Sequence, residues 1–259
     1  MNPIFEMRNV TKQFGGLYAV NDFSLAIGSH ELIGLIGPNG AGKTTVFNLI
    51  TGMLKPTAGD VFWKGENITR LPPHLVTARG IARTFQNIKL FSDMTVVENV
   101  MVSFHFSLKS NFLKAMIGLP SHTAEEKRIR KESMDHLIEC GLADLAEEKA
   151  QNLPYGKQRL LEIARALATR PDLLLLDEPA AGMNPMEKIE LAQFVREIRD
   201  RHKVAVLLIE HDMKFVMGLC ERIKVLDYGI SIAEGTPEEI RKDQRVIRAY
   251  LGGSKYAAG

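Results

Sequence analysis

The segment GPNGAGKTT at residues 37–45 constrains the fold of this chain more than any other stretch. It directly follows the apolar run LIGLI and precedes a helical pattern that begins at Lys43. Glycines spaced as G-x-x-x-x-G-K-[ST] let successive backbone N–H groups surround phosphate oxygens at a helix N-terminus. The segment therefore predicts a strand, a phosphate-binding loop and a helix. A glycine-rich turn without a ligand is the alternative.

The predicted loop indicates a nucleotide with a bound metal ion. In such a loop Lys43 bridges the β- and γ-phosphates, and the Thr44 hydroxyl holds Mg²⁺. The expected nucleotide contacts are Gly37, Pro38, Asn39, Gly40, Ala41, Gly42, Lys43, Thr44 and Thr45. Phe14, at the end of the first expected strand, is a candidate to stack on adenine, with a place in the core as the alternative. The guanine-recognising N-K-x-D motif is absent from the sequence.

A second feature is LLLLDEP at residues 173–179, where four leucines lead into two carboxylates. A parallel strand delivers its last side chains to the ligand crevice at the edge of the sheet. We therefore expect Asp177 to hold Mg²⁺ and Glu178 to face the γ-phosphate and its attacking water. The alternative is that both carboxylates cap a helix.

Short β-like runs alternate with helical patterns along most of the chain. Strands are expected at residues 32–37, 60–65, 80–85, 173–177, 204–210 and 222–229, and helices from residue 43 and over 186–201. This alternation predicts an α/β fold with a mostly parallel sheet.

Residues 87–152 break that alternation with a helical pattern. It places Ile129, Met134, Leu137 and Ile138 on one face. We therefore expect an α/β core of residues 1–86 and 153–235, an inserted helical subdomain at 87–152 and a helical tail at 236–259. In the tail, Thr236 is the expected N-cap, Pro237 follows it and Glu239 completes a capping box.

Composition excludes several classes of function. The 259 residues include 33 basic and 31 acidic ones without a long run of one sign, so nothing indicates a nucleic-acid partner. The two cysteines, Cys140 and Cys220, lie far apart, which favours free core thiols in a reducing compartment. We find no signal-peptide pattern and no apolar run near the roughly 20 residues of a membrane span, so we expect a cytoplasmic chain.

Six motifs in order resemble those of the ATP-binding-cassette (ABC) ATPases. They are GPNGAGKTT at 37–45, the glutamine of TFQN, LPYGKQ at 153–158, LLLLDEP at 173–179, AGMN at 181–184 and the histidine of LLIEHD. The resemblance implies a P-loop NTPase with an N-terminal antiparallel β region. It also implies a head-to-tail dimer in which Tyr155 and Gly156 of one chain cap the ATP held by the other.

The same resemblance implies roles for two residues that have no clear role taken alone. Gln86 would contact Mg²⁺ or water and link the site to the helical subdomain. His211 would contact the γ-phosphate. With Glu178 and Lys43, these residues form the expected catalytic set.

The sequence departs from the family pattern at two positions. Pro154 stands where the signature motif has a hydroxyl residue, which removes an O–H and an N–H donor. The backbone of Tyr155 and Gly156 and the N-terminus of the helix that follows would then make the phosphate contacts. Asn184 stands where Asp is usual. We expect slower hydrolysis but not an inactive site.

The chain resembles the ATPase subunits of branched-chain amino acid importers at both departures and in four further segments. These segments are FGGLYAV, RTFQNIKLFSDMTVVENV, DEPAAGMNP and EGTPEEI. This implies ATP hydrolysis coupled to uptake at the cytoplasmic face of the membrane. The implied partners are two membrane permease subunits, a second ATPase subunit that is either the same chain or a paralogue, and indirectly a solute-binding protein, with no nucleic acid.

Three alternatives remain for the function. They are the ATPase of a urea, amide or lipid transporter, a soluble ABC ATPase acting on DNA or ribosomes, and a nucleotide-binding regulator without turnover. One cassette with balanced charge disfavours the second, and intact Lys43, Asp177, Glu178 and His211 disfavour the third.

Residues 104–122 carry more apolar side chains than one helix face can bury. Phe112, Leu113, Met116 and Ile117 form one stripe, and Phe106 lies outside it. Either neighbouring helices cover the surplus, or part of this surface receives a permease helix.

Overall fold

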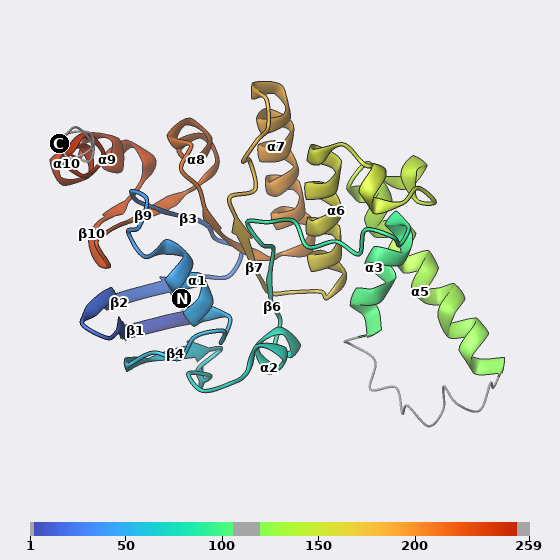
Figure 1. Ribbon diagram of the computed structural model, residues 1–259, viewed down its shortest axis with the longest axis horizontal. Coiled ribbons are helices and arrows are strands. Elements are labelled where there is room, and N and C mark those ends of the chain that lie inside the picture. Colours follow the sequence, from blue (N-terminus) through green and yellow to red (C-terminus); the bar gives the residue numbers. More distant parts are fainter. Residues whose placement is uncertain (1–2, 106–119, 253–259) are drawn as a thin grey trace. The chain divides into compact units, whose positions relative to one another are not determined.

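The computed structural model describes residues 3–105 and 120–252 (Figure 1). The chain forms two compact units, one of Met1–Arg83 with Asp172–Gly259 and the other of Thr84–Pro171. Residues 106–119 lie outside the described residues. The two alternatives for the apolar stretch that includes Phe106 and Phe112 therefore stay predictions.

The first unit contains a six-stranded sheet in which five strands run parallel. Its order is β10 (Ile230–Gly235), β9 (Arg222–Asp227), β3 (Leu32–Ile36), β8 (Ala205–Ile209), β7 (Leu173–Asp177) and β6 (Ile81–Arg83), with β10 antiparallel to β9. Every residue of β3, β7 and β8 is buried, as expected for parallel strands covered on both faces. The predicted α/β fold is confirmed.

A smaller antiparallel sheet has the order β2 (Leu17–Ile27), β1 (Phe5–Phe14), β4 (Ala58–Trp63) and β5 (Glu66–Asn67). Helix α1 (Lys43–Ile50) lies between this sheet and the larger one (Figure 1). One hydrophobic cluster joins Phe23 of the small sheet, Phe47 of α1 and Leu175 of the large sheet. Packing on both sides therefore holds the N-terminus of α1, where the phosphate loop was predicted.

The remaining described helices of the first unit are α2 (Pro73–Ala78), α7 (Pro185–His202), α8 (Met213–Leu219), α9 (Pro237–Lys242) and α10 (Gln244–Gly252). The side chains of Asn184, Asp212 and Thr236 cap α7, α8 and α9, whereas α2 has no side-chain cap. Thr236 and Glu239 form the capping box of α9 that the sequence predicted. Asn184 and Glu187 form a second capping box at the start of α7, which the sequence argument had not identified.

We expect Asn184→Ala to lower the free energy of unfolding by about 1 kcal/mol, since its side chain caps α7. Asn184 Oδ1 accepts from the backbone N–H groups of Met186 at 2.9 Å and Glu187 at 3.1 Å. Asn184→Asp keeps an acceptor and serves as the matched control. Urea unfolding of the three proteins measures the effect. Equal stability of all three would show that the Asn184 cap does not stabilise the fold.

The described residues of the second unit form helices and short 3₁₀ turns. The helices are α3 (Val96–His105), α5 (Pro120–Glu139) and α6 (Tyr155–Ala168), and the turns are Ala143–Leu145 and Ala150–Asn152. Helix α3 packs against both α5 and α6. The predicted subdomain ended at residue 152, whereas the compact unit runs through Pro171. The difference arises because α6 packs with the helices before it.

The predicted apolar face of α5 is correct at three positions and wrong at the fourth. Ile129 and Leu137 are buried and Met134 is half-buried. Ile138 is 63% exposed. Each helical residue is turned by about 100° from the one before it, so the residue after a buried Leu137 points away from the core.

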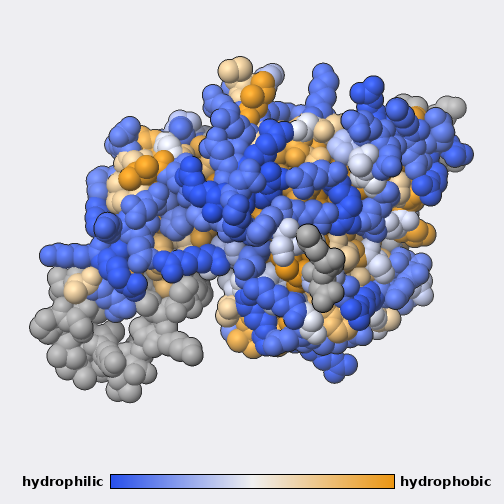
Figure 2. All heavy atoms as spheres, turned by 180° about the vertical axis from the view of Figure 1, so that it is seen from behind, coloured by the Kyte–Doolittle hydropathy of each residue, from blue (hydrophilic) through white to orange (hydrophobic). Residues whose placement is uncertain are grey.

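No described helix is long and apolar enough to cross a membrane. The face shown in Figure 2 is mainly hydrophilic, with apolar residues in small separate groups. Cys140 and Cys220 are free and buried, and burial raises the pKa of both thiols. This agrees with their predicted place in the core.

Candidate nucleotide site

The loop between β3 and α1 is closed at both ends by glycines that no other residue can replace without a clash. A Cβ atom at Gly37 would lie 2.0 Å from the backbone oxygen of Leu226, and one at Gly42 would lie 2.3 Å from that of Ala19. Gly42 also has a φ of 104°, in the region that favours glycine. The glycine spacing in the sequence therefore reflects the close approach of β9 and β2 to the loop.

Lys43 lies across this loop. Its side chain is largely buried, and Nζ donates to the backbone oxygens of Gly37 at 2.7 Å and Pro38 at 2.9 Å. Burial lowers the pKa of Lys43, and the nearby charges of Glu178 and Asp177 partly offset that effect. The structure thus brings one ammonium and two carboxylates into the same electrostatic neighbourhood.

Asp177 and Glu178 lie where β7 ends. Asp177 is buried as the last residue of the strand, and Glu178 has a left-handed φ of 48°. The Glu178 N–H donates to the backbone oxygen of Ile209 at 2.9 Å. A left-handed conformation at a non-glycine residue costs free energy and is enriched at functional sites. The helix-capping alternative fails because α7 begins only at Pro185 and is capped by Asn184.

Arg83 pairs with Asp177, a contact that the sequence argument missed. The distance between Arg83 Nη2 and Asp177 Oδ2 is 2.7 Å, and both side chains are almost fully buried. Arg83 Nη1 also donates to Asn48 Oδ1 of α1 at 2.6 Å. The sequence could have indicated this pair, because Arg83 is the one charged residue in the expected strand GIARTF and a buried charge needs a partner.

His211 lies in the segment between β8 and α8, beside Glu178. Its Nδ1 is 3.9 Å from Glu178 Oε2 and 3.7 Å from Glu210 Oε2, distances longer than hydrogen bonds. Because β3, β8 and β7 are adjacent and parallel, their carboxyl ends place the phosphate loop, His211 and Glu178 at one edge of the sheet. The His211 side chain is 60% exposed, so it can reach a ligand.

Phe14 ends strand β1, and its ring is 47% exposed. The Nζ atom of Lys12 lies 4.9 Å from the ring centroid. The core alternative for Phe14 is therefore wrong. Stacking on adenine stays a prediction.

The remaining predicted residues, Gln86, Tyr155 and Gly156, belong to the second unit. A fully buried arginine, Arg159, connects two of them. Its Nη2 donates to the Gln86 backbone oxygen at 2.7 Å and to the Tyr155 hydroxyl at 2.9 Å. Within this unit, the Gln86 segment is thus held at the start of α6.

Glu162 completes this arrangement in the second unit. Glu162 Oε2 accepts from Arg159 Nη1 at 3.0 Å, and Oε1 accepts from the Phe85 N–H at 3.0 Å. Burial raises the pKa of Glu162, and the Phe85 and Arg159 contacts partly offset the effect. The sequence could have indicated this buried pair, because Arg159 and Glu162 are spaced i, i+3 on an apolar helix face.

Helix α6 begins without a side-chain cap. Its N-cap residue is Pro154, which makes no capping hydrogen bond. The backbone N–H groups of the first turn, where Tyr155 and Gly156 lie, therefore have no capping side chain as acceptor. This is the arrangement that an anion at the helix N-terminus would use.

A family model described as ABC transporter matches residues 20–181 of the chain. The chain belongs to the ABC transporter ATPase family. A second model, described as branched-chain amino acid ATP-binding cassette transporter, matches residues 232–256.

Individual relatives agree with this membership. The cassette is 47% identical to the high-affinity branched-chain amino acid transport ATP-binding protein BraF of Pseudomonas aeruginosa, over 96% of this chain and 98% of BraF. It is 35% identical to the lipopolysaccharide export system ATP-binding protein LptB of Haemophilus influenzae, over 96% of this chain and 97% of LptB. The crystal structure of the ADP conformation of MJ1267, an ATP-binding cassette of an ABC transporter, superposes with a TM-score of 0.84 at 30% identity, covering 97% of this chain and 100% of that one.

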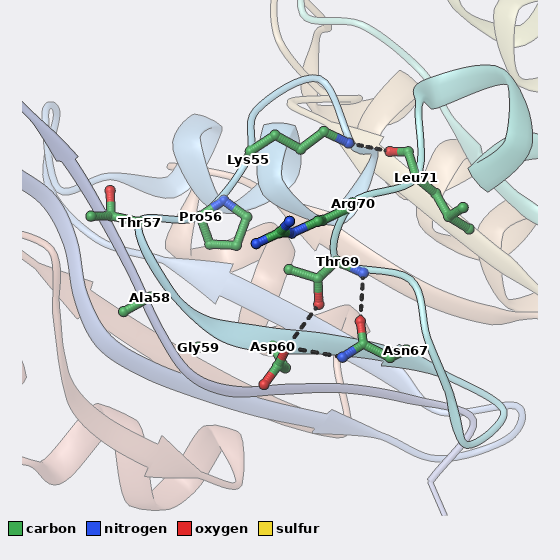
Figure 3. A pocket seen from close by; sticks show the side chains of 10 residues that line it. All are labelled: Lys55, Pro56, Thr57, Ala58, Gly59, Asp60, Asn67, Thr69, Arg70 and Leu71. Atoms are coloured by element: carbon green, nitrogen blue, oxygen red, sulfur yellow. Dashed lines mark hydrogen bonds between the residues drawn. The ribbon is translucent and has the colours of Figure 1, made fainter.

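A pocket of about 770 Å³ elsewhere in the cassette is separate from the predicted nucleotide contacts (Figure 3). Three of its polar residues bond to one another: Asn67 Nδ2 donates to Asp60 Oδ1 at 2.9 Å, and the Thr69 N–H donates to Asn67 Oδ1 at 3.0 Å. No predicted site residue lines it. The lining residues are Lys55, Pro56, Thr57, Ala58, Gly59, Asp60, Asn67, Thr69, Arg70 and Leu71.

Proposed function

We propose that this cassette hydrolyses ATP at the cytoplasmic face of a membrane and drives the uptake of branched-chain amino acids through partner permease subunits. The observation that carries the proposal is the 47% identity to BraF across nearly the whole chain. The match of residues 232–256 to a branched-chain amino acid cassette model supports the same assignment. LptB, named for lipopolysaccharide export, is less similar at 35% identity.

The residues at the sheet edge fit ATP with Mg²⁺. The loop of residues 37–45 offers backbone N–H groups and the Lys43 ammonium to the phosphates, while Thr44 and Asp177 provide oxygen donors of the kind Mg²⁺ prefers. When bound, Mg²⁺ would neutralise charge that develops on the phosphates. In the structure, the buried Asp177 carboxylate pairs with a cation, the Arg83 guanidinium, at 2.7 Å.

Two side chains act on the reacting groups. Glu178 orients or deprotonates the attacking water from a position where its backbone has a left-handed φ of 48°. His211 donates to the γ-phosphate from the segment after β8. Gln86 would contact Mg²⁺ or water, and Phe14 would stack on the adenine.

A second cassette, either another copy of this chain or a paralogue, completes the site. Tyr155 and Gly156 of that cassette cap the ATP with the free N–H groups of the first turn of α6. The other partners are two permease subunits and, through them, a solute-binding protein. Balanced charge favours this over an ATPase acting on nucleic acid.

Purification of the tagged protein from native membranes tests the proposal. We expect two permease subunits to co-elute and leucine uptake to require them. The Lys43→Ala variant should co-elute with the same subunits without supporting uptake. Uptake of urea or an amide in place of leucine would correct the substrate, and absence of membrane partners would contradict the transport function.

A further inference from the structure

Glu210 is a buried carboxylate that joins the two segments carrying the proposed reacting side chains. Its side chain is only 1% exposed. Oε1 accepts from the Ala180 N–H at 2.7 Å, and Oε2 accepts from the His211 N–H at 3.1 Å. Ala180 lies two residues after Glu178. One carboxylate therefore bonds to both the Glu178 loop and the His211 segment.

The Glu178 loop is held in a conformation that it would not adopt alone. Glu178 has a φ of 48°, a left-handed conformation that costs on the order of 1–3 kcal/mol and persists only when surrounding contacts maintain it. Two such contacts come from the same short segment. They are the bond from the Glu178 N–H to Ile209 at 2.9 Å and the bond from Ala180 to Glu210 at 2.7 Å.

We infer that Glu210 is a positioning residue of the ATPase reaction, whose two carboxylate oxygens keep Glu178 and His211 in a fixed relative arrangement. The inference rests on the proposed roles of these two residues. Glu210 itself is too deeply buried to touch the nucleotide. It acts through the two loops, so its loss should alter turnover more than nucleotide binding.

The two oxygens have different partners: Oε1 bonds to the Glu178 loop, and Oε2 bonds to the N–H of the next residue, His211. Burial raises the pKa of the Glu210 carboxyl, and the N–H groups of Ala180, His211 and Asp212, with the nearby His211 ring, partly offset that rise. A glutamine at this position offers one acceptor oxygen and one NH₂ group, which cannot accept from an N–H. Glu210→Gln would therefore lose one of these two hydrogen bonds while keeping the size of the side chain.

Steady-state ATPase kinetics of Glu210→Gln and Glu210→Ala test the role. We expect Glu210→Gln to lower kcat by about 10- to 100-fold, the effect of a misplacement of about 1 Å. The KM for ATP should stay within roughly twofold, because the phosphate loop is untouched. Glu210→Ala should lower kcat further and also lower the melting temperature, since it leaves the buried Ala180 N–H without this acceptor.

Glu239→Gln is the matched control. Glu239 Oε2 also accepts a backbone N–H, that of Thr236 at 2.8 Å, but it lies in the capping box of α9. We expect a small change in stability and an unchanged kcat for this variant. An equal loss of kcat in the Glu239 and Glu210 variants would reduce Glu210 to a general stability role and overturn the inference.

Hydrogen exchange of the nucleotide-free protein gives a readout that does not depend on activity. The amides of Ala180 or His211 should exchange faster in Glu210→Gln than in the wild type. Unchanged exchange, or a wild-type kcat in Glu210→Gln, overturns the inference alone. Absence of ATPase activity in the wild-type complex would instead contradict the proposed function, and the exchange result would still decide whether Glu210 holds the two loops.

Discussion

Glu178→Gln is expected to lower the ATPase kcat by roughly two to four orders of magnitude, the usual contribution of a positioned general base. The carboxylate follows β7 on a left-handed residue whose N–H is bonded to Ile209. An amide of the same size keeps these backbone contacts but cannot take a proton from water. ATP affinity should therefore persist, and ATP-dependent dimers should accumulate because hydrolysis no longer separates them.

Glu66→Gln provides a matched control for this experiment. Glu66 lies on β5, and its side chain is 67% exposed and pairs with Arg79 at 3.3 Å. Exposed ion pairs contribute little, so turnover should be unchanged. Turnover of Glu178→Gln at the wild-type level would remove Glu178 from the mechanism. Loss of ATP binding would show that Glu178 has a structural role in the loop.

Lys43→Ala should weaken ATP binding by at least about 10- to 150-fold, since one hydrogen bond to a charged group contributes about 1.5–3 kcal/mol. In the structure, Lys43 Nζ bonds to the backbone oxygens of Gly37 and Pro38 within the loop itself. Removing the ammonium would delete the proposed phosphate contact, and it removes both hydrogen bonds that Lys43 makes within the loop. Equilibrium binding of ATP to the purified chain measures the loss.

Lys64→Ala is the corresponding control. Lys64 belongs to the same unit, and its Nζ pairs with Asp172 Oδ2 at 2.6 Å with both side chains about half exposed. Its removal takes away one positive charge without touching the loop, so ATP affinity should not change. Equal weakening in both variants would mean that net charge, and not the position of Lys43, governs binding.

The sequence predicted the first unit well where the determining contacts are local. Helix α9 starts at Thr236 because that side chain caps the backbone N–H three residues later. The parallel strands were recognisable because burial on both faces requires continuous apolar runs such as LLLL. The roles of the phosphate loop, Asp177, Glu178, Gln86 and His211 came from motif chemistry and from resemblance. The Lys43 and Glu178 variants test two of these predictions.

The parts that could not be predicted depend on residues far apart in the chain. Arg83 meets Asp177 across 94 positions, and Arg159 meets Gln86 across 73. Glu210 meets Ala180 across 30 positions. The periodic pattern of apolar residues in the sequence does not predict such pairs. Each partner taken alone shows no sign of the distant residue that it contacts.

Local chemistry alone determined that this chain has a glycine-lined loop between a buried strand and a helix, two carboxylates at a strand end and capped helices. Only the tertiary structure decided that Ile138 faces solvent, that α6 belongs with α3 and α5, and that one buried glutamate holds two loops together. The physical reason is the range of the interactions. Caps and turns are satisfied within a few residues, whereas a buried charge must find its partner wherever the sheet order places it.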